Sequence, residues 1–334
     1  MNYIAKRTAQ AVFTVFAVMS LTFGLIRILP GGPTDFLRAR LIRQGGLSRA
    51  QINQRIGALT NVNPDKPLFF QYVDYMTSIL QGDFGTSTWY GDPVSGILLD
   101  AIPWTVFLMA SSLSLMFVIG VTLGAFMAYR EGSKFDVSST VVSLVLNSTP
   151  YYVVALLFIA FLGYRWQLFP TGGRYASELS PGFSVAFIAS VLYHGALPIT
   201  SLAITGFGGW ALNMRGNSIR VLGEDYLRVA RLRGLSESRI ALRYVARNAI
   251  LPMYTGLLIA IGGVFGGSII LEQIFSYPGV GYYLIRAIGQ RDYPVMMGGF
   301  LIITIAVVIG IYIADLTYGW VDPRAERGGS RESY

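Results

Sequence analysis

The sequence predicts an all-α polytopic membrane protein with about six transmembrane helices. Of its 334 residues, 53% are hydrophobic and only 13% are charged, whereas soluble domains carry about a quarter charged residues. Six segments contain no charged side chain: 8–26, 101–129, 137–164, 179–214, 253–271 and 295–314. A helix crosses the hydrocarbon core with about 20 mostly apolar residues, so each segment is long enough to span a membrane.

The N-terminal segment, residues 1–29, is expected to be the first of these helices. Lys6 and Arg7 precede an apolar run that is longer than the apolar region of a signal peptide, and no small-x-small cleavage site follows it. The rest of the chain divides into an extracytoplasmic region, a five-helix core with a cytoplasmic loop, and a cytoplasmic tail: 30–100, 101–320 with its loop at 211–250, and 321–334.

The distribution of positive charge predicts the orientation of the chain. If the N-terminus lies inside, the short internal segments hold 15 of the 26 lysines and arginines, which is the arrangement that the positive-inside rule favours. We therefore expect a multi-pass protein of the plasma (inner) membrane with both termini in the cytoplasm. Because the net charge of +8 mostly flanks the spans, it indicates contact with membrane lipid and no nucleic-acid partner.

The polar region at 30–100 carries helical patterns of its own. Helices are predicted over Ser48–Leu59 and Leu68–Leu80, on either side of a break at Pro64–Pro67. Four apolar side chains are expected on one face of the second helix: Phe69, Tyr72, Val73 and Met76. We expect a small helical extracytoplasmic insertion between spans 1 and 2, acting as a lid or docking surface; a solvated connector is the alternative.

The most informative feature is the basic loop at 211–250, which is too charged to lie in lipid. Glu224–Arg233 is predicted to form a short helix with acids at its start and arginines in its last turn, which suits the helix dipole. Gly234 can end that helix in the left-handed conformation. Ser236 is then expected to cap a second helix, with Leu235 and Ile240 as a hydrophobic staple.

That second helix is expected over residues 236–249, before Pro252 introduces the next span. Arg239, Arg243 and Arg247 recur on one of its faces. The alternative interpretation of these arginines is a stripe that attracts anionic lipid, worth about 1 kcal/mol per residue near the surface. Lipid attraction alone does not explain the turn at Gly234, so the loop is expected to dock a partner.

The chain lacks the residues that disulfides, several metal sites and a nucleotide-binding loop require. The chain has no cysteine, which excludes disulfides and thiolate metal sites, and its single histidine excludes an HExxH zinc site. None of the three lysines follows a glycine, so the chain has no Walker A loop for nucleotide. We expect a non-catalytic chain that binds no metal or cofactor; if ATP drives it, ATP and Mg are bound by partner subunits.

Two other functions remain as alternatives. A stand-alone ion-coupled transporter would need ionisable side chains inside the membrane, but the charges nearest the six segments lie at span ends, where they are expected to reach the interface: Arg27, Glu272 and Asp315. His194, inside the fourth segment, could relay protons or simply pack or line a pore. An intramembrane hydrolase would need Ser268 or Ser201 beside His194, and no Gly-x-Ser-x-Gly elbow is present.

Two further patterns concern the pore and helix packing. Gly263 and Gly267 belong to two interleaved Gly-x-x-x-Gly pairs in the fifth segment, which allow close approach of helices. They indicate either packing within the chain or a subunit interface or pore. Asn147 and Pro150, midway along the third segment, predict a kink that faces a polar cavity; packing without a cavity is the alternative.

With these residues in view, the chain resembles the permease subunits of ABC importers in the dipeptide/oligopeptide/nickel branch. The resemblance covers nearly the whole length and rests on stretches that occur in the branch's order: Tyr3–Pro33, Gly82–Ser87 with Pro93-Val94 and Ile102-Pro103, Asp225–Ser236, Glu272–Gly281, Arg291–Val295 and Ala314–Arg324. It implies the fold of an ABC importer permease, which forms half of a translocation path.

The resemblance also implies partners and a coupling site. The turn at 225–236 would be the coupling helix that fits a groove on an ATPase subunit, with these residues at the contact: Asp225, Tyr226, Arg228, Ala230, Arg231, Gly234, Leu235 and Ser236. Arg228 stands where the wider family has Glu, which leaves the polarity of the contact open. The implied partners are a homologous second permease subunit, two ABC ATPase subunits and an extracytoplasmic solute-binding protein that delivers a peptide, nickel, a sugar or a similar solute.

Overall fold

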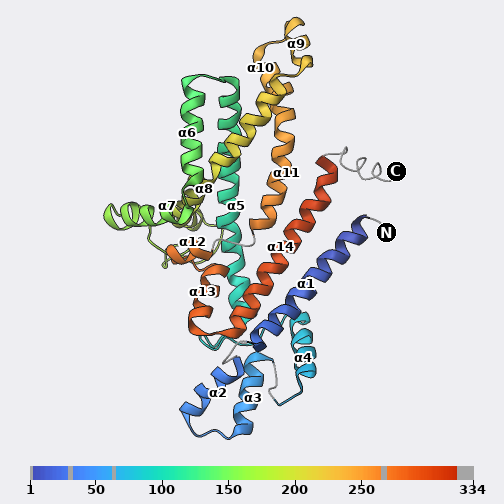
Figure 1. Cartoon of the computed structure of the whole chain (residues 1–334). Helices are drawn as coiled ribbons and strands as arrows, with labels where there is room; N and C mark the ends of the chain where they lie inside the picture. Colours follow the sequence, from blue (N-terminus) through green and yellow to red (C-terminus); the bar gives the residue numbers. More distant parts are fainter. Residues whose placement is uncertain (1–2, 29–32, 62–64, 265–268, 322–334) are drawn as a thin grey trace. The chain divides into compact units, whose positions relative to one another are not determined.

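The structure is a computed structural model that describes residues 3–28, 33–61, 65–264 and 269–321 (Figure 1). Every regular element within these residues is helical, apart from one isolated β-bridge between Thr86 and Pro93. The chain divides into two compact units. The first unit comprises residues 1–106 and 265–312, and the second comprises residues 107–264 and 313–334.

Within the described residues, five helical stretches are long and apolar enough to cross a membrane. This result confirms the all-α polytopic class. A sixth span is present if the sharply bent helix pair at 134–165 is counted as one. The five stretches lie in α1 (Tyr3–Ile28), α5 (Val94–Tyr129), α8 (Val185–Leu222), the π-helix η2 (Ile240–Ala246) with α11 (Arg247–Val264), and α14 (Tyr293–Val321).

The third predicted span is not one straight helix. α6 (Lys134–Ser148) stops before Pro150, and α7 (Tyr151–Phe158), continued by the π-helix η1 (Ile159–Arg165), leaves at an angle of 89°. Proline drives the preceding residue out of the α region, and Thr149 accordingly has φ −85° and ψ 124°. The charge-free segment 137–164 is therefore divided between two helices, and the predicted kink is a complete break.

The fifth predicted span, 253–271, lies partly outside the described residues. Its described part belongs to an apolar stretch that begins earlier, at Arg243, and runs to Ile261. Pro252 lies inside α11 instead of preceding the span. α11 is described as far as Val264, and the short helix α12 (Ile269–Ile274) follows after four residues that lie outside the described part of the chain.

Three helices lie between α1 and α5: α2 (Pro33–Gln44), α3 (Arg49–Thr60) and α4 (Leu68–Leu80). The predicted start of α3 is confirmed, because Ser48 and Gln51 form a reciprocal capping box. α2 was not expected from the sequence. It packs against α3 through a small buried cluster: Leu37, Leu41, Ile52 and Ile56.

α4 packs along α1 (Figure 1). The Tyr72 ring contacts Phe23, and its hydroxyl lies 2.7 Å from the Ser20 hydroxyl. Tyr75 is buried beside the same Phe23, and burial raises the pKa of its phenol, which is therefore neutral. The predicted apolar face is split: Tyr72 and Met76 pack inward, whereas Phe69 and Val73 are exposed.

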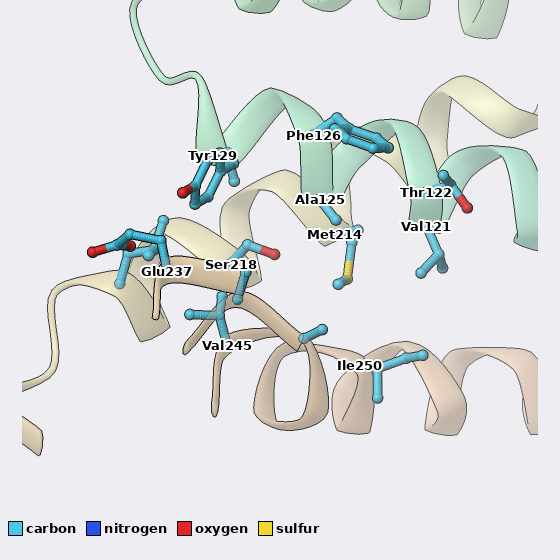
Figure 2. Close-up of a pocket in the computed structure, with 14 residues that line it drawn as sticks. Val121, Thr122, Ala125, Phe126, Tyr129, Met214, Ser218, Glu237, Val245 and Ile250 are labelled. Carbon is cyan, nitrogen blue, oxygen red and sulfur yellow. The ribbon is translucent and has the colours of Figure 1, made fainter. Parts of the chain in front are cut away.

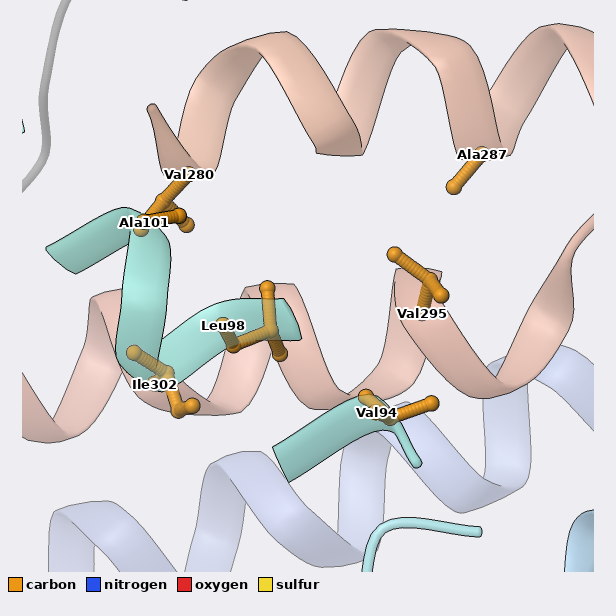
Figure 3. Packing of buried hydrophobic residues seen from close by; sticks show 7 residues of the cluster. All are labelled: Val94, Leu98, Ala101, Val280, Ala287, Val295 and Ile302. Atoms are coloured by element: carbon orange, nitrogen blue, oxygen red, sulfur yellow. The ribbon is translucent and has the colours of Figure 1, made fainter. Parts of the chain in front are cut away.

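The core of the first unit joins the start of α5 to α13 (Val280–Gln290) and α14, as Figure 3 shows. The close approach of α14 to α5 depends on Gly298, since a Cβ there would lie 2.8 Å from Val94. The cluster consists of Val94, Leu98, Ala101, Val280, Ala287, Val295 and Ile302.

A buried carboxylate fastens the loop before α5 to the turn before α14. Asp292 is fully buried and accepts hydrogen bonds from the Ser87 hydroxyl and from the backbone N–H groups of Thr88 and Trp89. The Ser87 hydroxyl oxygen in turn accepts the N–H of Tyr90 at 2.8 Å. These hydrogen bonds therefore join the stretches 82–87 and 291–295, which are separate motifs in the sequence.

The carboxylate of Glu272 does not lie where the sequence predicts. Glu272 was expected to reach the interface from a span end, but it is 1% exposed. Its two oxygens accept hydrogen bonds from the Thr105 hydroxyl at 2.7 Å and the Tyr282 N–H at 2.9 Å. A Cβ at Gly279 would lie 2.5 Å from the same carboxylate, so glycine is needed where the chain passes Glu272.

The second unit is built on close contacts between helix backbones. A Cβ at Gly208 of α8 would lie 2.3 Å from the Ser143 carbonyl of α6, and one at Gly124 of α5 would lie 2.2 Å from the Ala211 carbonyl of α8. Small residues permit this approach where lipid leaves no hydrophobic drive between helices. α8 therefore packs tightly against both neighbours.

Replacing Asp292 with alanine should lower the thermal stability of the purified protein in detergent. The buried donors at 87–89 would lose their acceptor, at a cost of about 1–3 kcal/mol for each unsatisfied group. Asp92→Ala is the matched control, because the Asp92 side chain is exposed in the same loop. Equal melting temperatures for the two variants would contradict the role given to Asp292.

Alanine substitutions at two glycines should act in opposite directions. Gly124→Ala should destabilise the second unit, because its Cβ would meet the α8 backbone. Gly216→Ala has open space around its Cβ and should be neutral or stabilise α8, by up to about 1 kcal/mol. Thermal unfolding of both variants, followed by circular dichroism, tests this; a destabilised Gly216→Ala with an unaffected Gly124→Ala would contradict it.

Candidate functional site

The candidate site is the loop between α8 and α11, which carries the helix α9 (Asp225–Leu232). Figure 1 shows α8 and α11 as two arms with α9 at their tip. α8 runs without interruption to Leu222, and Glu224 then adopts the extended backbone of an N-cap residue. Asp225 in the first turn and Arg231 in the last turn both suit the helix dipole.

The loop has a small hydrophobic core of its own. Leu227 and Ala230 of α9 are buried against Ile240 and Val245 of the returning arm. Leu235 packs against the same cluster, which includes Ile240; a direct pairing of the two side chains stays a prediction. This core holds α9 in a fixed position on the two arms, and it places Ala230 inside the loop rather than on its outer surface.

The turn after α9 is a Schellman motif. Gly234 has φ +71°, its N–H donates to the Arg231 carbonyl at 2.9 Å, and the Leu235 N–H donates to the Ala230 carbonyl at 3.3 Å. The predicted left-handed glycine is therefore confirmed. Ser236 lies at the expected N-cap position with an extended backbone, but its side chain makes no capping hydrogen bond, contrary to expectation.

The returning arm is not the regular helix expected over 236–249. It consists of α10 (Glu237–Arg239), the π-helix η2 and the start of α11. Arg239, Arg243 and Arg247 are all exposed, as their spacing predicts. Arg231 pairs with Glu237 across the turn at 3.2 Å; both side chains are about half exposed, so the pair adds little stability.

The outer face of α9 exposes an apolar stripe. Tyr226, Val229 and Leu232 are 41%, 52% and 81% exposed, and their spacing of three residues places them on one face of the helix. Arg228 and Arg231 are exposed beside them. Sequence reasoning singled out Tyr226 but missed Val229 and Leu232; the three-residue spacing opposite the buried Leu227 and Ala230 was the available signal.

A buried ion pair, here called the clamp, joins α6 to the part of α8 that leads into the loop. Asp136 at the start of α6 is 1% exposed and accepts two hydrogen bonds from the Arg215 guanidinium of α8, at 2.6 and 2.7 Å. It also accepts the Gly132 N–H at 3.0 Å. A bidentate, largely buried pair of this kind fixes orientation as well as distance. Sequence reasoning did not identify this clamp.

The structure places the predicted pore and packing candidates in separate settings. His194 Nδ1 lies 2.8 Å from the Ser190 carbonyl of its own helix. Asn147 is exposed at the end of α6 and faces Gly209 of α8, and Pro150 starts α7. Gly263 lies in the last turn of α11, whereas Gly267 lies outside the described residues. Among the described residues, no group of three or more His, Asp or Glu side chains is arranged to hold a metal ion.

Comparison with known proteins agrees with this architecture. Residues 120–327 match the family described as binding-protein-dependent transport system inner membrane component. The oligopeptide transport system permease protein AppB of Bacillus subtilis is 34% identical over 97% of this chain and 99% of its own length. The di/tripeptide transport system permease protein DppB of Pseudomonas aeruginosa is 32% identical over 97% of this chain and 98% of its own.

A third relative, the dipeptide transport system permease protein DppB of Escherichia coli K12, is 29% identical over 97% of this chain and 98% of its own length. The likeness therefore includes both compact units and the loop that carries α9. With the family match over residues 120–327 and a relative above 30% identity along almost the whole chain, the chain belongs to the family of binding-protein-dependent transport system inner membrane components.

Proposed function

We propose that the chain is the permease subunit of an ATP-driven importer of peptides or similar small solutes, and that α9 is its contact with an ATPase subunit. The apolar stripe of Tyr226, Val229 and Leu232 is the observation that supports this contact most directly. Exposed apolar side chains gathered on one helix face mark a protein interaction site. The helix is also preformed, since its buried face and its Schellman turn hold it in place without a partner.

The chemistry of the stripe fits a groove on another protein. Side chains such as valine and leucine contribute about 1.5–3 kcal/mol each when they become fully buried. Arg228 and Arg231 flank the stripe and would meet acidic or carbonyl groups at the groove's rim. ATP and Mg would bind to that partner, since no Walker A sequence occurs in this chain. The permease itself would bind no cofactor.

The substrate assignment rests on the relatives, whose names describe permeases of oligopeptides, dipeptides and tripeptides. A homologous second permease subunit would complete the translocation path, and an extracytoplasmic binding protein would deliver the solute. Both termini and α9 would lie in the cytoplasm. His194, Asn147 and Pro150 remain candidates for the path, and Gly263 and Gly267 remain candidates for helix packing.

The mechanical route from α9 into the membrane runs through α8. α9 follows Leu222 after two residues, and α8 is fastened to α6 by the Asp136–Arg215 clamp and by the Gly208 contact. A movement of the ATPase groove would therefore shift α8 and α6 together. In this scheme, ATP binding and hydrolysis on the partners alternately open the two sides of the path.

Leu232→Ser should weaken the attachment of the ATPase subunits without unfolding the permease. Loss of one buried leucine contact predicts an affinity at least about tenfold lower and a corresponding fall in ATP-driven uptake. The measurement is ATPase co-purification together with uptake in vesicles. Leu168→Ser is the control, because Leu168 is 54% exposed but lies outside the loop; equal losses in both variants would contradict the assignment.

Uptake should require the ATPase partners and should not require an ion gradient. The permease reconstituted alone should transport no peptide uphill, whereas the full complex with ATP should do so in the presence of a protonophore. The buried carboxylate of Glu272 is the group that an ion-coupled transporter would most plainly use, so Glu272→Gln is the second test. Uphill transport by the lone chain, or proton-driven uptake abolished by Glu272→Gln, would favour the stand-alone transporter instead.

A further inference from the structure

A pocket of about 480 Å³ lies inside the second unit, between α5, α8 and the returning arm of the α9 loop (Figure 2). Its wall is largely apolar, with Val121, Ala125 and Phe126 from α5, Met214 from α8, and Val245 and Ile250 from the returning arm. The loop itself contributes Glu237 to one end of the pocket. Nothing in the proposed coupling at the tip of α9 uses this space.

The pocket runs from the helix ends toward the middle of the span. Tyr129 and Glu237 lie at one end and Val121 and Ile250 at the other. From Tyr129 to Val121 the distance along α5 is about 12 Å, at 1.5 Å per residue. In the orientation of the proposed function, the first end lies at the headgroup layer of the inner leaflet and the second end lies in the hydrocarbon.

A buried hydroxyl inside the pocket has no partner. Ser218 is 1% exposed and its Oγ makes no hydrogen bond, although buried Ser112 and Ser201 each donate to the carbonyl four residues earlier in their own helices. Figure 2 shows the Ser218 hydroxyl directed into the space between α5 and the returning arm. A buried donor that lacks a partner in the protein requires an explanation, and an acceptor supplied by a ligand is one.

One end of the pocket carries charge and is called its rim here. Glu237 lines this end and pairs with Arg231 at 3.2 Å. Arg239 and Arg243 do not line the pocket but are exposed on the turns that follow Glu237. Phe126 and Tyr129 line the pocket and are also more than half exposed on α5, so the apolar wall continues onto the outer surface of a membrane-spanning helix. The site therefore combines an apolar channel, the unpaired Ser218 hydroxyl a turn inside it, and a charged rim; Thr122 and Tyr129 also line it.

We propose that this pocket holds one acyl chain of a glycerophospholipid from the inner leaflet. The acyl chain lies along Val121, Met214 and Ile250, an ester carbonyl accepts the Ser218 hydroxyl, and the headgroup phosphate meets the arginines at the rim. The proposal rests on the orientation given under the proposed function. Because Glu237 and Val245 belong to the loop, a lipid in the pocket would brace the α9 loop against α5.

Two kinds of variant separate this site from general lipid contact. Ala246→Phe and Ala125→Phe fill the pocket from opposite walls, and Ser218→Ala removes only the unpaired hydroxyl. Val118→Phe is the matched control, because Val118 is 60% exposed on α5 and does not line the pocket. The complete transporter, purified in mild detergent, is titrated with palmitoyl-oleoyl phosphatidylglycerol or phosphatidylethanolamine, and retained lipid is counted by native mass spectrometry.

We expect the wild type and the Val118→Phe variant each to retain one more phospholipid per permease chain than either pocket-filling variant. Ser218→Ala should bind that lipid about three- to tenfold more weakly, the effect of one hydrogen bond. Its melting temperature without added lipid should equal or exceed that of the wild type, since the hydroxyl is then unsatisfied. If phosphatidylglycerol is retained more tightly than phosphatidylethanolamine, the rim recognises the phosphate alone. If phosphatidylethanolamine is retained more tightly, Glu237 also binds its ammonium group.

Equal lipid counts in the wild type and in both folded pocket-filling variants would overturn the proposal. So would a photoreactive residue at Ala125 that joins a protein chain instead of lipid, because a partner segment would then occupy the pocket. Lipid is counted without ATP or solute. If the variants show no difference in lipid count, the coupling role proposed for α9 is therefore unaffected. If the ATPase subunits no longer co-purify, the lipid count can still be measured.

Discussion

The lack of water in the hydrocarbon core is the constraint on which this structure depends. A chain that crosses lipid must satisfy its backbone hydrogen bonds within its own helices, and every polar side chain that is buried needs a partner. The three buried carboxylates of the described residues follow this requirement. Asp292 and Glu272 each receive hydroxyl and backbone donors, and Asp136 receives a guanidinium. Each one joins segments that are distant in the sequence.

The sequence predicts well those features that depend on local composition. Charge-free stretches identify α1, α5, α8 and α14, because the cost of a charge in lipid acts on each helix separately. The capping pattern at Ser48 and the glycine at 234 also predict the local structure, since both are set by backbone geometry. The loop that carries α9 is predictable for the same reason: its helix and turn are encoded within a few residues of one another.

Features that depend on distant contacts could not be predicted in this way. Glu272 looks like an interfacial charge from its position, and only the approach of Thr105 and Tyr282 explains its burial. Asp292 and Ser87 are about two hundred residues apart, and Arg215 gives no local sign of its pairing with Asp136. The outward stripe of α9 was partly missed because the pattern of residues 225–236 drew attention to Ala230, which the structure uses for the loop's internal core.

The clamp between Asp136 and Arg215 has a consequence for the far end of α6. Together with the contact of Gly208 on Ser143, it attaches α6 to α8 at two levels, so we expect a movement of one helix to carry the other. α6 ends at the right-angled break before Pro150, roughly 22 Å from its start at 1.5 Å per residue. Under the proposed function, a small tilt at the base of α6 would therefore become a larger sideways displacement of the α7 segment.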